Sequence, residues 1–364
     1  MKRLLIVIGT RPNFIKVTQM KKAAEKHNID TCIVHTGQHY DANMAEVFFK
    51  QFHLEPDVVL AYTHTNVGNQ IGAILSELSN QMVAYAPDLV MVVGDVNSTL
   101  AGAIAANKLG IPIAHLESGL RSRDRSMPEE INRILTDEIT DLFFVTEQDG
   151  LKNLKEEGKS TENTFLVGNT MIDTMVAFEN EIESAEYHQK LELEEKEYIL
   201  MTFHRPALVD FREGLEKLID LLERASKLKH IVLPLHPRTK LRLENEGLWE
   251  RFNAIEQLTL LTPVGYFEFQ NLVKYAFCIV TDSGGIQEET TFRQIPCLTV
   301  RPNTERPSTI DVGSNTLVNI DPDRILSLLN DMVAGVYKQG EVPQKWDGKA
   351  TDRIMEIIAQ KLQR

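Results

Sequence analysis

Short runs of branched and apolar residues, each followed by a polar turn, recur along the chain. In the first half they lie at 4–8, 31–34, 88–93, 111–115, 142–145 and 165–167. In the second half they lie at 198–203, 230–235, 258–261, 277–281 and 297–300. Runs this short and apolar are typical of parallel strands buried on both faces. With helices predicted between them, for example at 99–109 and 286–292, the pattern indicates an α/β fold.

The strand–helix rhythm is interrupted once, between Ala177 and Glu197, where the chain is rich in Glu. We interpret this segment as a surface helix and linker, and place the domain boundary there. The chain should therefore form two doubly wound domains, residues 1–175 and 176–349. Polar residues gather at the strand ends of both, so we expect a cleft between the domains to hold the ligand.

Composition limits the kinds of partner. The chain has 364 residues, 43% of them hydrophobic, with a net charge of −13. This length is sufficient for two separate cores. The negative charge argues against nucleic acid or an anionic membrane as a partner, so an anionic ligand must be held by local cations and N–H groups.

The three cysteines lie in apolar, strand-like runs and lack the spacing of a zinc site. We expect them to be reduced, in a cytoplasmic protein. His35 and His39 are four residues apart, but Gly37 argues against a helix there, so no metal site is predicted. The N-terminus indicates a first strand and not a signal peptide, and no apolar run approaches the length of a membrane span.

The segment 277–291 ends a predicted strand in a glycine turn and starts a helix. Ser283 is a common N-cap type, and Gly284 and Gly285 allow close approach of a ligand to the backbone. The free N–H groups of such a helix N-terminus suit a phosphate. An ordinary helix cap fits the same pattern equally well.

Charged residues follow several strands of the first half. Arg11 and Lys16 should lie in the loop and first helical turn after the first strand, either as solvated cations or facing an anionic ligand. Asp95 and Glu117 lie at the ends of two later strands, where ligands gather in open α/β sheets. Asp95 alone could equally serve as a helix cap.

Pro128 opens a predicted helix whose first turn contains Glu129. Glu129 and Arg133 are four residues apart and can pair on one face. The carboxylate then either complements the helix dipole or serves as a tuned acid or base.

In the second half, polar side chains follow successive strands of one predicted sheet: His204, His236, Ser283 and Arg306. Their convergence is harder to attribute to chance than any single residue. Phe269 is either a core residue or an exposed ring that stacks on a base.

Taken in order, the motifs GTRPNFIK, TGQHYD, GD followed by NST, HLESGLRS, MPEEINR, GNTMID, FHRP, DSGGIQEE and NTERP resemble those of the non-hydrolysing UDP-N-acetylglucosamine 2-epimerases. The resemblance extends from about Gly9 to about Gly313. It implies a fold like the GT-B glycosyltransferases, with a last helix, about 350–364, returning to the N-terminal domain. It also implies a homodimer that serves polysaccharide biosynthesis.

The reaction that the resemblance implies is interconversion of UDP-GlcNAc and UDP-ManNAc, an isomerase reaction without a cofactor. The C2 proton of the sugar is not next to a carbonyl, so plain abstraction is very unfavourable. The family's route eliminates UDP to form a 2-acetamidoglucal and adds it back with the opposite configuration at C2. This route requires a base, an acid on the opposite face and stabilisation of the leaving diphosphate.

The resemblance also implies residue roles. The active-site groups correspond to Asp95, Glu117, Glu129 and His204, and Arg133 matches the arginine after the PEE motif. The substrate-binding residues correspond to Arg11, Lys16, Ser283, Gly284 and Gly285 for the diphosphate, Glu289 for the ribose and Phe269 for the uracil. Gln38 and His236 match positions of an allosteric site in some members, although FHRPAL and HPR replace the family's frequent HRREN and HxNP.

Four alternatives stay open at this stage. The substrate could be UDP-2,3-diacetamido-glucuronate, which relatives in the family use. A hydrolysing epimerase would release free ManNAc, and a GT-B glycosyltransferase would need an acceptor. A silent UDP-sugar-binding module would leave the C2 proton unexchanged.

Overall fold

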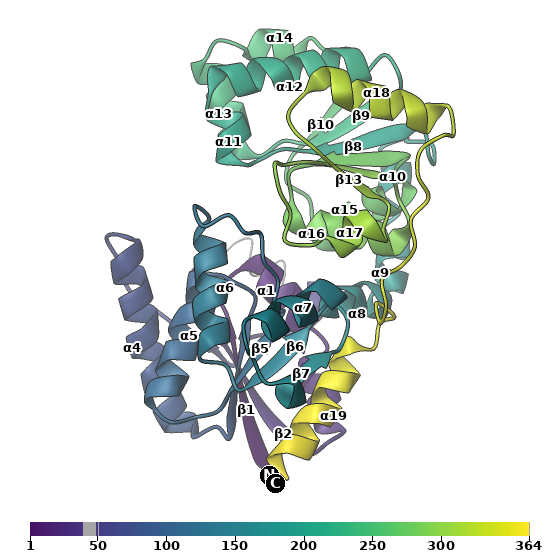
Figure 1. Cartoon of the computed structure of the whole chain (residues 1–364). Coiled ribbons are helices and arrows are strands. Elements are labelled where there is room, and N and C mark those ends of the chain that lie inside the picture. Colours follow the sequence, from purple (N-terminus) through teal and green to yellow (C-terminus); the bar gives the residue numbers. More distant parts are fainter. Residues whose placement is uncertain (39–48, 50, 364) are drawn as a thin grey trace. The chain divides into compact units, whose positions relative to one another are not determined.

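The computed structural model describes residues 1–38, 49 and 51–363. It forms two compact units (Figure 1). Met1–Ala177 and the C-terminal segment from Gln344 make up unit 1, and Phe178–Pro343 make up unit 2. Unit 1 is therefore built from two separate stretches of chain.

Unit 1 contains a seven-stranded sheet in the order β3-β2-β1-β4-β5-β6-β7, with all neighbours parallel. Its strands are β1 (Lys2–Ile8), β2 (Ile29–His35), β3 (Val58–Val59), β4 (Leu89–Val93), β5 (Ile113–Leu116), β6 (Leu142–Val145) and β7 (Thr164–Leu166). All residues of β4, β5 and β6 are buried, as expected for strands covered on both faces.

The helices of unit 1 cover both faces of this sheet. They are α1 (Arg11–Val17), α2 (Met20–Glu25), α4 (Val67–Tyr85), α5 (Asn97–Lys108), α6 (Pro128–Glu138), α7 (Gln148–Glu156), α8 (Thr170–Ala177) and α19 (Ala350–Leu362), with a 3₁₀ turn at Thr161–Asn163. The neighbours α4, α5 and α6 lie side by side on one face (Figure 1). The C-terminal helix α19 packs against α2 and α8.

Unit 2 repeats this plan with a six-stranded parallel sheet in the order β10-β9-β8-β11-β12-β13. Its strands are β8 (Tyr198–Thr202), β9 (His230–Pro234), β10 (Leu258–Leu261), β11 (Cys278–Thr281), β12 (Cys297–Val300) and β13 (Asn315–Val318). In both sheets the chain first extends in one direction and then restarts beside the first strand. This reversal creates a topological switch point between β1 and β4 and another between β8 and β11.

Two groups of helices cover the sheet of unit 2. The helices are α9 (Glu179–Ser184), α10 (Tyr187–Lys190), α11 (Pro206–Val209), α12 (Arg212–Ala225), α13 (Pro237–Asn245), α14 (Trp249–Asn253), α15 (Tyr266–Tyr275), α16 (Gly284–Arg293), α17 (Ser308–Asp311) and α18 (Pro322–Val333). Helices α12 and α18 pack together on one face, and α15 and α16 lie on the other (Figure 1). Each face has its own buried apolar cluster.

The predicted strands are all present, with ends displaced by at most two residues. Two edge strands were missed: β3 has only two residues, and β13 begins with the polar Asn315. The Glu-rich segment 177–197 contains the short helices α9 and α10 and not one longer surface helix. The predicted absence of a metal at His35 and His39 concerns a residue, His39, that lies outside the described part.

His35 itself is buried at the end of β2, and its Nδ1 accepts the N–H of Gly37 at 3.0 Å. Burial lowers the pKa of His35 to about 4, which indicates a neutral structural residue. Within the described ranges, no group of three His, Cys, Asp or Glu is placed to hold a metal. Among the same residues, no helix combines the length and the apolar character needed to cross a bilayer.

Candidate active site

The first cluster of candidate residues lies at the switch point of unit 1, in the loops after β1, β4 and β5. The neighbouring strands β1 and β4 are each followed directly by a glycine, Gly9 and Gly94. A Cβ on Gly9 would lie 2.1 Å from Ser98 Oγ, and Gly94 has a positive φ of 69°. These glycines let the loops approach each other closely, which brings the residues after them together.

Asp95, directly after Gly94, pairs with Arg133 on α6. Arg133 is buried, and Asn132 beside it donates to the Asp95 carbonyl at 3.0 Å. The structure thus gives Arg133 a carboxylate partner other than the Glu129 that the helical spacing suggested. Glu129 is exposed in the first turn of α6.

Glu117 pairs with Lys16, and both side chains are buried. The expected position of Lys16 was wrong: α1 has only seven residues, so Lys16 lies in its last turn and points into the unit. Glu117 also has a φ of 72°, a left-handed conformation that is uncommon for a residue with a Cβ. Such strain tends to occur where the position of a functional side chain is important.

Two further residues support these loops. Glu130, which the motif analysis passed over for Glu129, is buried and accepts from Ser122 N at 2.8 Å and Arg123 N at 3.0 Å. Gln38 Oε1 accepts from Ser98 N at 2.9 Å and Ser98 Oγ at 2.7 Å, at the N-terminus of α5. Sequence reasoning could have suspected Glu130, a buried carboxylate directly after an exposed Glu, only from the loop that it holds.

The second cluster lies at the switch point of unit 2. His204 Nδ1 contacts Asp282 Oδ1 at 2.8 Å, and the half-exposed imidazole lies after β8. Asp282 is buried, and its Oδ2 also accepts the N–H groups of His204 and Arg205 at 2.8 and 2.7 Å. Burial opposes ionisation, but His204 and these N–H groups outweigh it and hold the pKa of Asp282 below its ordinary value. Asp282 therefore orients His204.

Ser283, Gly284 and Gly285 begin helix α16 and are partly exposed. A Cβ on Gly284 would lie 3.2 Å from Arg306 Nη1 and 3.4 Å from Glu305 Oε1, so these side chains lie close against the start of the helix. Arg306 is buried and contacts Glu288 through Nε at 3.0 Å and Glu305 through Nη1. The helix N-terminus favours an anionic ligand, whereas the charge of Arg306 is already balanced by its two carboxylate contacts.

The remaining predicted residues occupy varied environments. Arg11 is exposed at the start of α1, and Glu289 is buried in α16. Phe269 on α15 is only partly buried and packs against the apolar cluster of its face, so its ring has a core contact and a part that solvent reaches. His236 caps α13, where its Nδ1 accepts from Arg238 N at 3.2 Å. Burial, with His204 and Arg238 nearby, lowers the pKa of His236.

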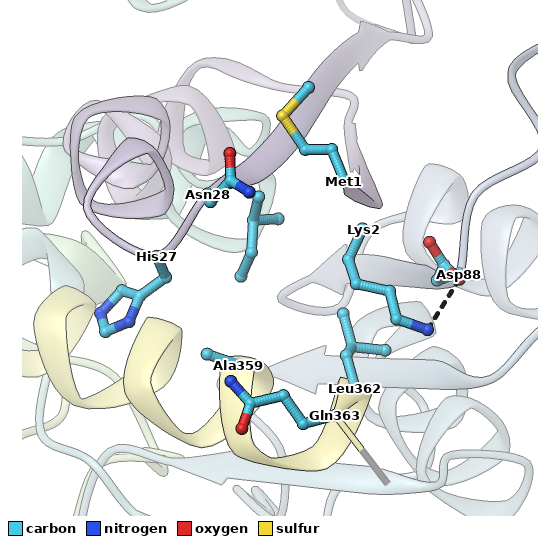
Figure 2. A pocket seen from close by; sticks show the side chains of 9 residues that line it. Met1, Lys2, His27, Asn28, Asp88, Ala359, Leu362 and Gln363 are labelled. Atoms are coloured by element: carbon cyan, nitrogen blue, oxygen red, sulfur yellow. Dashed lines mark hydrogen bonds and ion pairs between the residues drawn. The ribbon is translucent and has the colours of Figure 1, made fainter.

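A groove of about 470 Å³ lies at the opposite, amino ends of the unit 1 strands (Figure 2). Its lining includes Met1, His27 and Gln363. Lys2 and Asp88 in this groove form a partly exposed ion pair at 3.3 Å. The groups that line this groove are ordinary surface groups. The pairs Asp95–Arg133 and Glu117–Lys16 lie instead at the carboxyl ends of the strands.

Comparison with known proteins identifies related chains. The family model described as UDP-N-acetylglucosamine 2-epimerase matches residues 21–359. The UDP-N-acetylglucosamine 2-epimerase of Methanocaldococcus jannaschii is 39% identical over 364 residues, covering 98% of each chain. The UDP-2,3-diacetamido-2,3-dideoxy-D-glucuronate 2-epimerase of Pseudomonas aeruginosa is 38% identical and covers 98% of this chain and 99% of its own.

Solved structures agree with this. The M. jannaschii UDP-GlcNAc 2-epimerase in complex with UDP-GlcNAc and UDP has a TM-score of 0.88 at 38% identity, covering 98% of this chain and 99% of that one. A sucrose-phosphate synthase from Thermosynechococcus elongatus has a TM-score of 0.60 at 14% identity, covering 100% and 98%. The second likeness concerns the fold alone, and it confirms the predicted GT-B-like pair of Rossmann-like units.

Proposed function

Because this chain belongs to the UDP-N-acetylglucosamine 2-epimerase family, we propose that it interconverts UDP-GlcNAc and UDP-ManNAc by inverting the configuration at C2. The pairing of Asp95 with Arg133 and of Glu117 with Lys16 at one switch point carries the proposal. A binding module or a simple transferase has no evident use for two carboxylates that are each held by a buried cation.

In the proposed reaction a carboxylate takes the C2 proton while the C1–O bond to UDP breaks. The electron pair of the C2–H bond forms the C1=C2 bond of a 2-acetamidoglucal, and UDP leaves with the bonding pair of C1–O. Return of UDP to C1 and of a proton to the other face of C2 completes the inversion. Asp95, Glu117 and Glu129 are the proposed acid and base groups, because each is a carboxylate in or beside the loops of the first switch point.

The leaving diphosphate needs its own stabilisation, since a poor leaving group would stop the elimination. We assign this role to the N–H groups of Ser283, Gly284 and Gly285 and to His204, with Arg11 and Lys16 as further cations. Glu289 and Phe269 are proposed for the ribose and uracil. The helix N-terminus supports this assignment, because its free N–H groups favour negative charge.

Product analysis in deuterated water tests the proposal. UDP-GlcNAc alone should convert to a mixture with UDP-ManNAc, and NMR should show deuterium at C2 of both sugars. Free ManNAc would identify a hydrolysing enzyme, and turnover only with an added acceptor would identify a transferase. Binding of UDP without exchange at C2 would leave only a binding module.

Substitution of the carboxylates sharpens the test. Asp95→Asn or Glu117→Gln should lower kcat by at least about 10²–10⁴-fold, the usual contribution of a general acid or base, while UDP still binds. Glu138→Gln is a matched control, because Glu138 is an exposed carboxylate on the same helix α6 as Glu129. Activity like that of the unsubstituted enzyme in Asp95→Asn would remove Asp95 from the mechanism.

UDP-2,3-diacetamido-glucuronate is a second candidate substrate, because a 2-epimerase for this sugar is 38% identical over nearly the whole chain. Parallel assays with the two UDP-sugars decide between them by the ratio of kcat/KM.

We further propose a homodimer in the cytoplasm, where the three buried, unpaired cysteines would stay reduced. Light scattering of the purified enzyme tests the dimer. The allosteric role of Gln38 and His236 stays a prediction, which a non-hyperbolic dependence of rate on UDP-GlcNAc would support.

A further inference from the structure

His115, the third residue of β5, is fully buried and makes two hydrogen bonds through its ring. Nδ1 lies 2.7 Å from Asp137 Oδ1, and Nε2 lies 2.7 Å from the carbonyl oxygen of Gly94. A carboxylate and a carbonyl can only accept, so both ring nitrogens must donate. With Asp137 ionised, this geometry makes both ring nitrogens of His115 donors, one to helix α6 and one to the loop after β4.

Asp137 on α6 is equally buried and connects His115 to Arg121. Its Oδ2 accepts from Arg121 Nη2 at 2.7 Å and from the N–H of Gly119 at 3.1 Å. Burial opposes ionisation of Asp137, but His115 and Arg121 outweigh it and keep its pKa below the ordinary value. Arg121 also binds both oxygens of Glu157, at 2.9 and 2.6 Å.

The buried members of this cluster are His115, Asp137 and Arg121, whereas Glu157 lies at the surface. Buried charges are tolerated when they are paired and hydrogen-bonded, and here the Asp137 carboxylate is held by Arg121, by His115 and by the N–H of Gly119. Asp137 thereby joins β5 and the loop after it to helix α6.

The backbone groups held by this pair belong to the two loops that carry candidate carboxylates. Gly94, which His115 holds, directly precedes Asp95. Gly119, which Asp137 holds, is two residues after the strained Glu117. Helix α6 adds a third connection, because Arg133, the partner of Asp95, lies one turn before Asp137.

We propose that His115 and Asp137 are positioning residues, which hold the backbones of Gly94 and Gly119 and thereby place the carboxylates of Asp95 and Glu117. Neither side chain needs to touch the substrate for this role. The inference rests on the proposed epimerase function for its kinetic consequence but not for its geometry. Small displacements of reacting groups are costly: about 1 Å of misplacement can lower a rate by about 10²-fold.

The kinetic test uses His115→Gln and Asp137→Asn in the full-length enzyme. Gln offers one donor group in place of two fixed ones, and Asn puts an N–H₂ group where Asp137 must accept. Each variant should lower kcat by about 10²-fold, with UDP affinity changed by less than about threefold. A small effect on UDP is expected because its uracil, ribose and amide contacts are assigned to unit 2.

Two control variants separate positioning from general support of the fold. Asp141 Oδ2 accepts the N–H of Ile113 at 2.9 Å, at the opposite end of the same strand β5. Asp141→Asn should therefore lower the melting temperature and leave kcat of the folded enzyme unchanged. Thr136→Val alters the buried neighbour of Asp137, whose hydroxyl has no hydrogen-bond partner among the described residues, and should change neither. Unchanged kcat in both His115→Gln and Asp137→Asn would overturn the proposal.

A spectroscopic test of the His115 hydrogen bonds does not depend on the catalytic activity of the enzyme. In enzyme labelled with ¹⁵N-histidine, both ring nitrogens of His115 should give the signals of hydrogen-bonded N–H donors, identified by their loss in His115→Gln. A single unprotonated nitrogen would overturn the double-donor geometry. Amide exchange of Gly119 should be slow and should accelerate in Asp137→Asn. If the unsubstituted enzyme fails to epimerise UDP-GlcNAc, the proposed function fails, while these two readouts still decide the inference.

Discussion

Three candidate active-site residues each contact a buried side chain that can carry the opposite charge: Asp95, Glu117 and His204. The partners are Arg133, Lys16 and Asp282. A neighbouring opposite charge favours the ionised form of a group, and a buried partner also fixes the orientation of the side chain that it contacts. Removing one member of the Lys16–Glu117 pair, which is buried on both sides, leaves an unpaired buried charge and costs about 3–5 kcal/mol. The cost should be smaller for the partly exposed Asp95 and the half-exposed His204. Substitutions at these residues should therefore be compared pair by pair, with stability measured beside activity.

His35 gives a prediction about pH at the level of a single residue. Its folded pKa of about 4 lies below the ordinary 6.5 because of burial. The unfolded chain therefore binds more protons between pH 6.5 and pH 4, and stability falls as the pH is lowered through this window. The full effect is about 3 kcal/mol.

In His35→Asn, whose side-chain oxygen can replace Nδ1 as an acceptor, most of this acid loss should disappear. Urea unfolding at a series of pH values measures the difference between the two proteins. His27→Asn is the control, since His27 is exposed and its replacement removes a histidine without disturbing the core. Parallel pH curves for the His35→Asn variant and the unsubstituted chain would show that His35 does not titrate as expected.

At the level of elements, the C-terminal helix α19 depends on a cap supplied by another helix. Its own N-cap residue, Lys349, makes no side-chain cap bond. Asp173 on α8 instead accepts the N–H groups of Ala350 and Thr351 at 3.1 and 2.5 Å. This contact fixes the first turn of α19 against α8 and so attaches the end of the chain to unit 1.

Asp173→Ala should destabilise the protein by about 1–3 kcal/mol, because it leaves two buried N–H groups without their acceptor. Asp352→Ala is the matched control. Asp352 forms an exposed pair with Lys26 at 2.8 Å, and pairs of this kind contribute less than about 1 kcal/mol. Chemical denaturation of both variants measures the contrast, and equal losses would show that the cap has no special importance.

At the level of the whole molecule, unit 1 is discontinuous and unit 2 is not. Ile354, Met355 and Ile358 of α19 are fully buried within unit 1. Large buried side chains contribute about 2–5 kcal/mol each, so the joint loss of these three is comparable to the whole stability of a typical domain. Unit 2 contains its two apolar clusters within one stretch of chain.

A chain that ends at Pro343 should therefore lose ordered structure in unit 1 and keep it in unit 2. Hydrogen exchange followed by mass spectrometry should show fast exchange in β1, β4 and β5 and retained protection in β8 and β11. A chain that ends at Leu362 keeps all of α19 and is the control. Full protection of β1 and β4 in the shorter chain would contradict this dependence.

The sequence predicted the strands well because a buried parallel strand is a local pattern of apolar residues. It missed β3 and β13 because edge strands pair on one side only and tolerate polar or very short runs. The family resemblance and the enzyme class are confirmed by the comparisons. The roles given to individual site residues stay predictions, although the structure brings several of them to the two switch points.

The sequence by itself determined which segments become strands and which polar residues follow them, since both depend on neighbours along the chain. Only the tertiary structure decided the partners: Arg133 pairs with Asp95 and not Glu129, Lys16 is buried against Glu117, and His115 joins Gly94 to Asp137. These choices depend on the order of strands in the sheet, which brings residues from 21 to 101 positions apart into contact. Local patterns contain no information about such distances, so pairing and protonation could be assigned only in the folded chain.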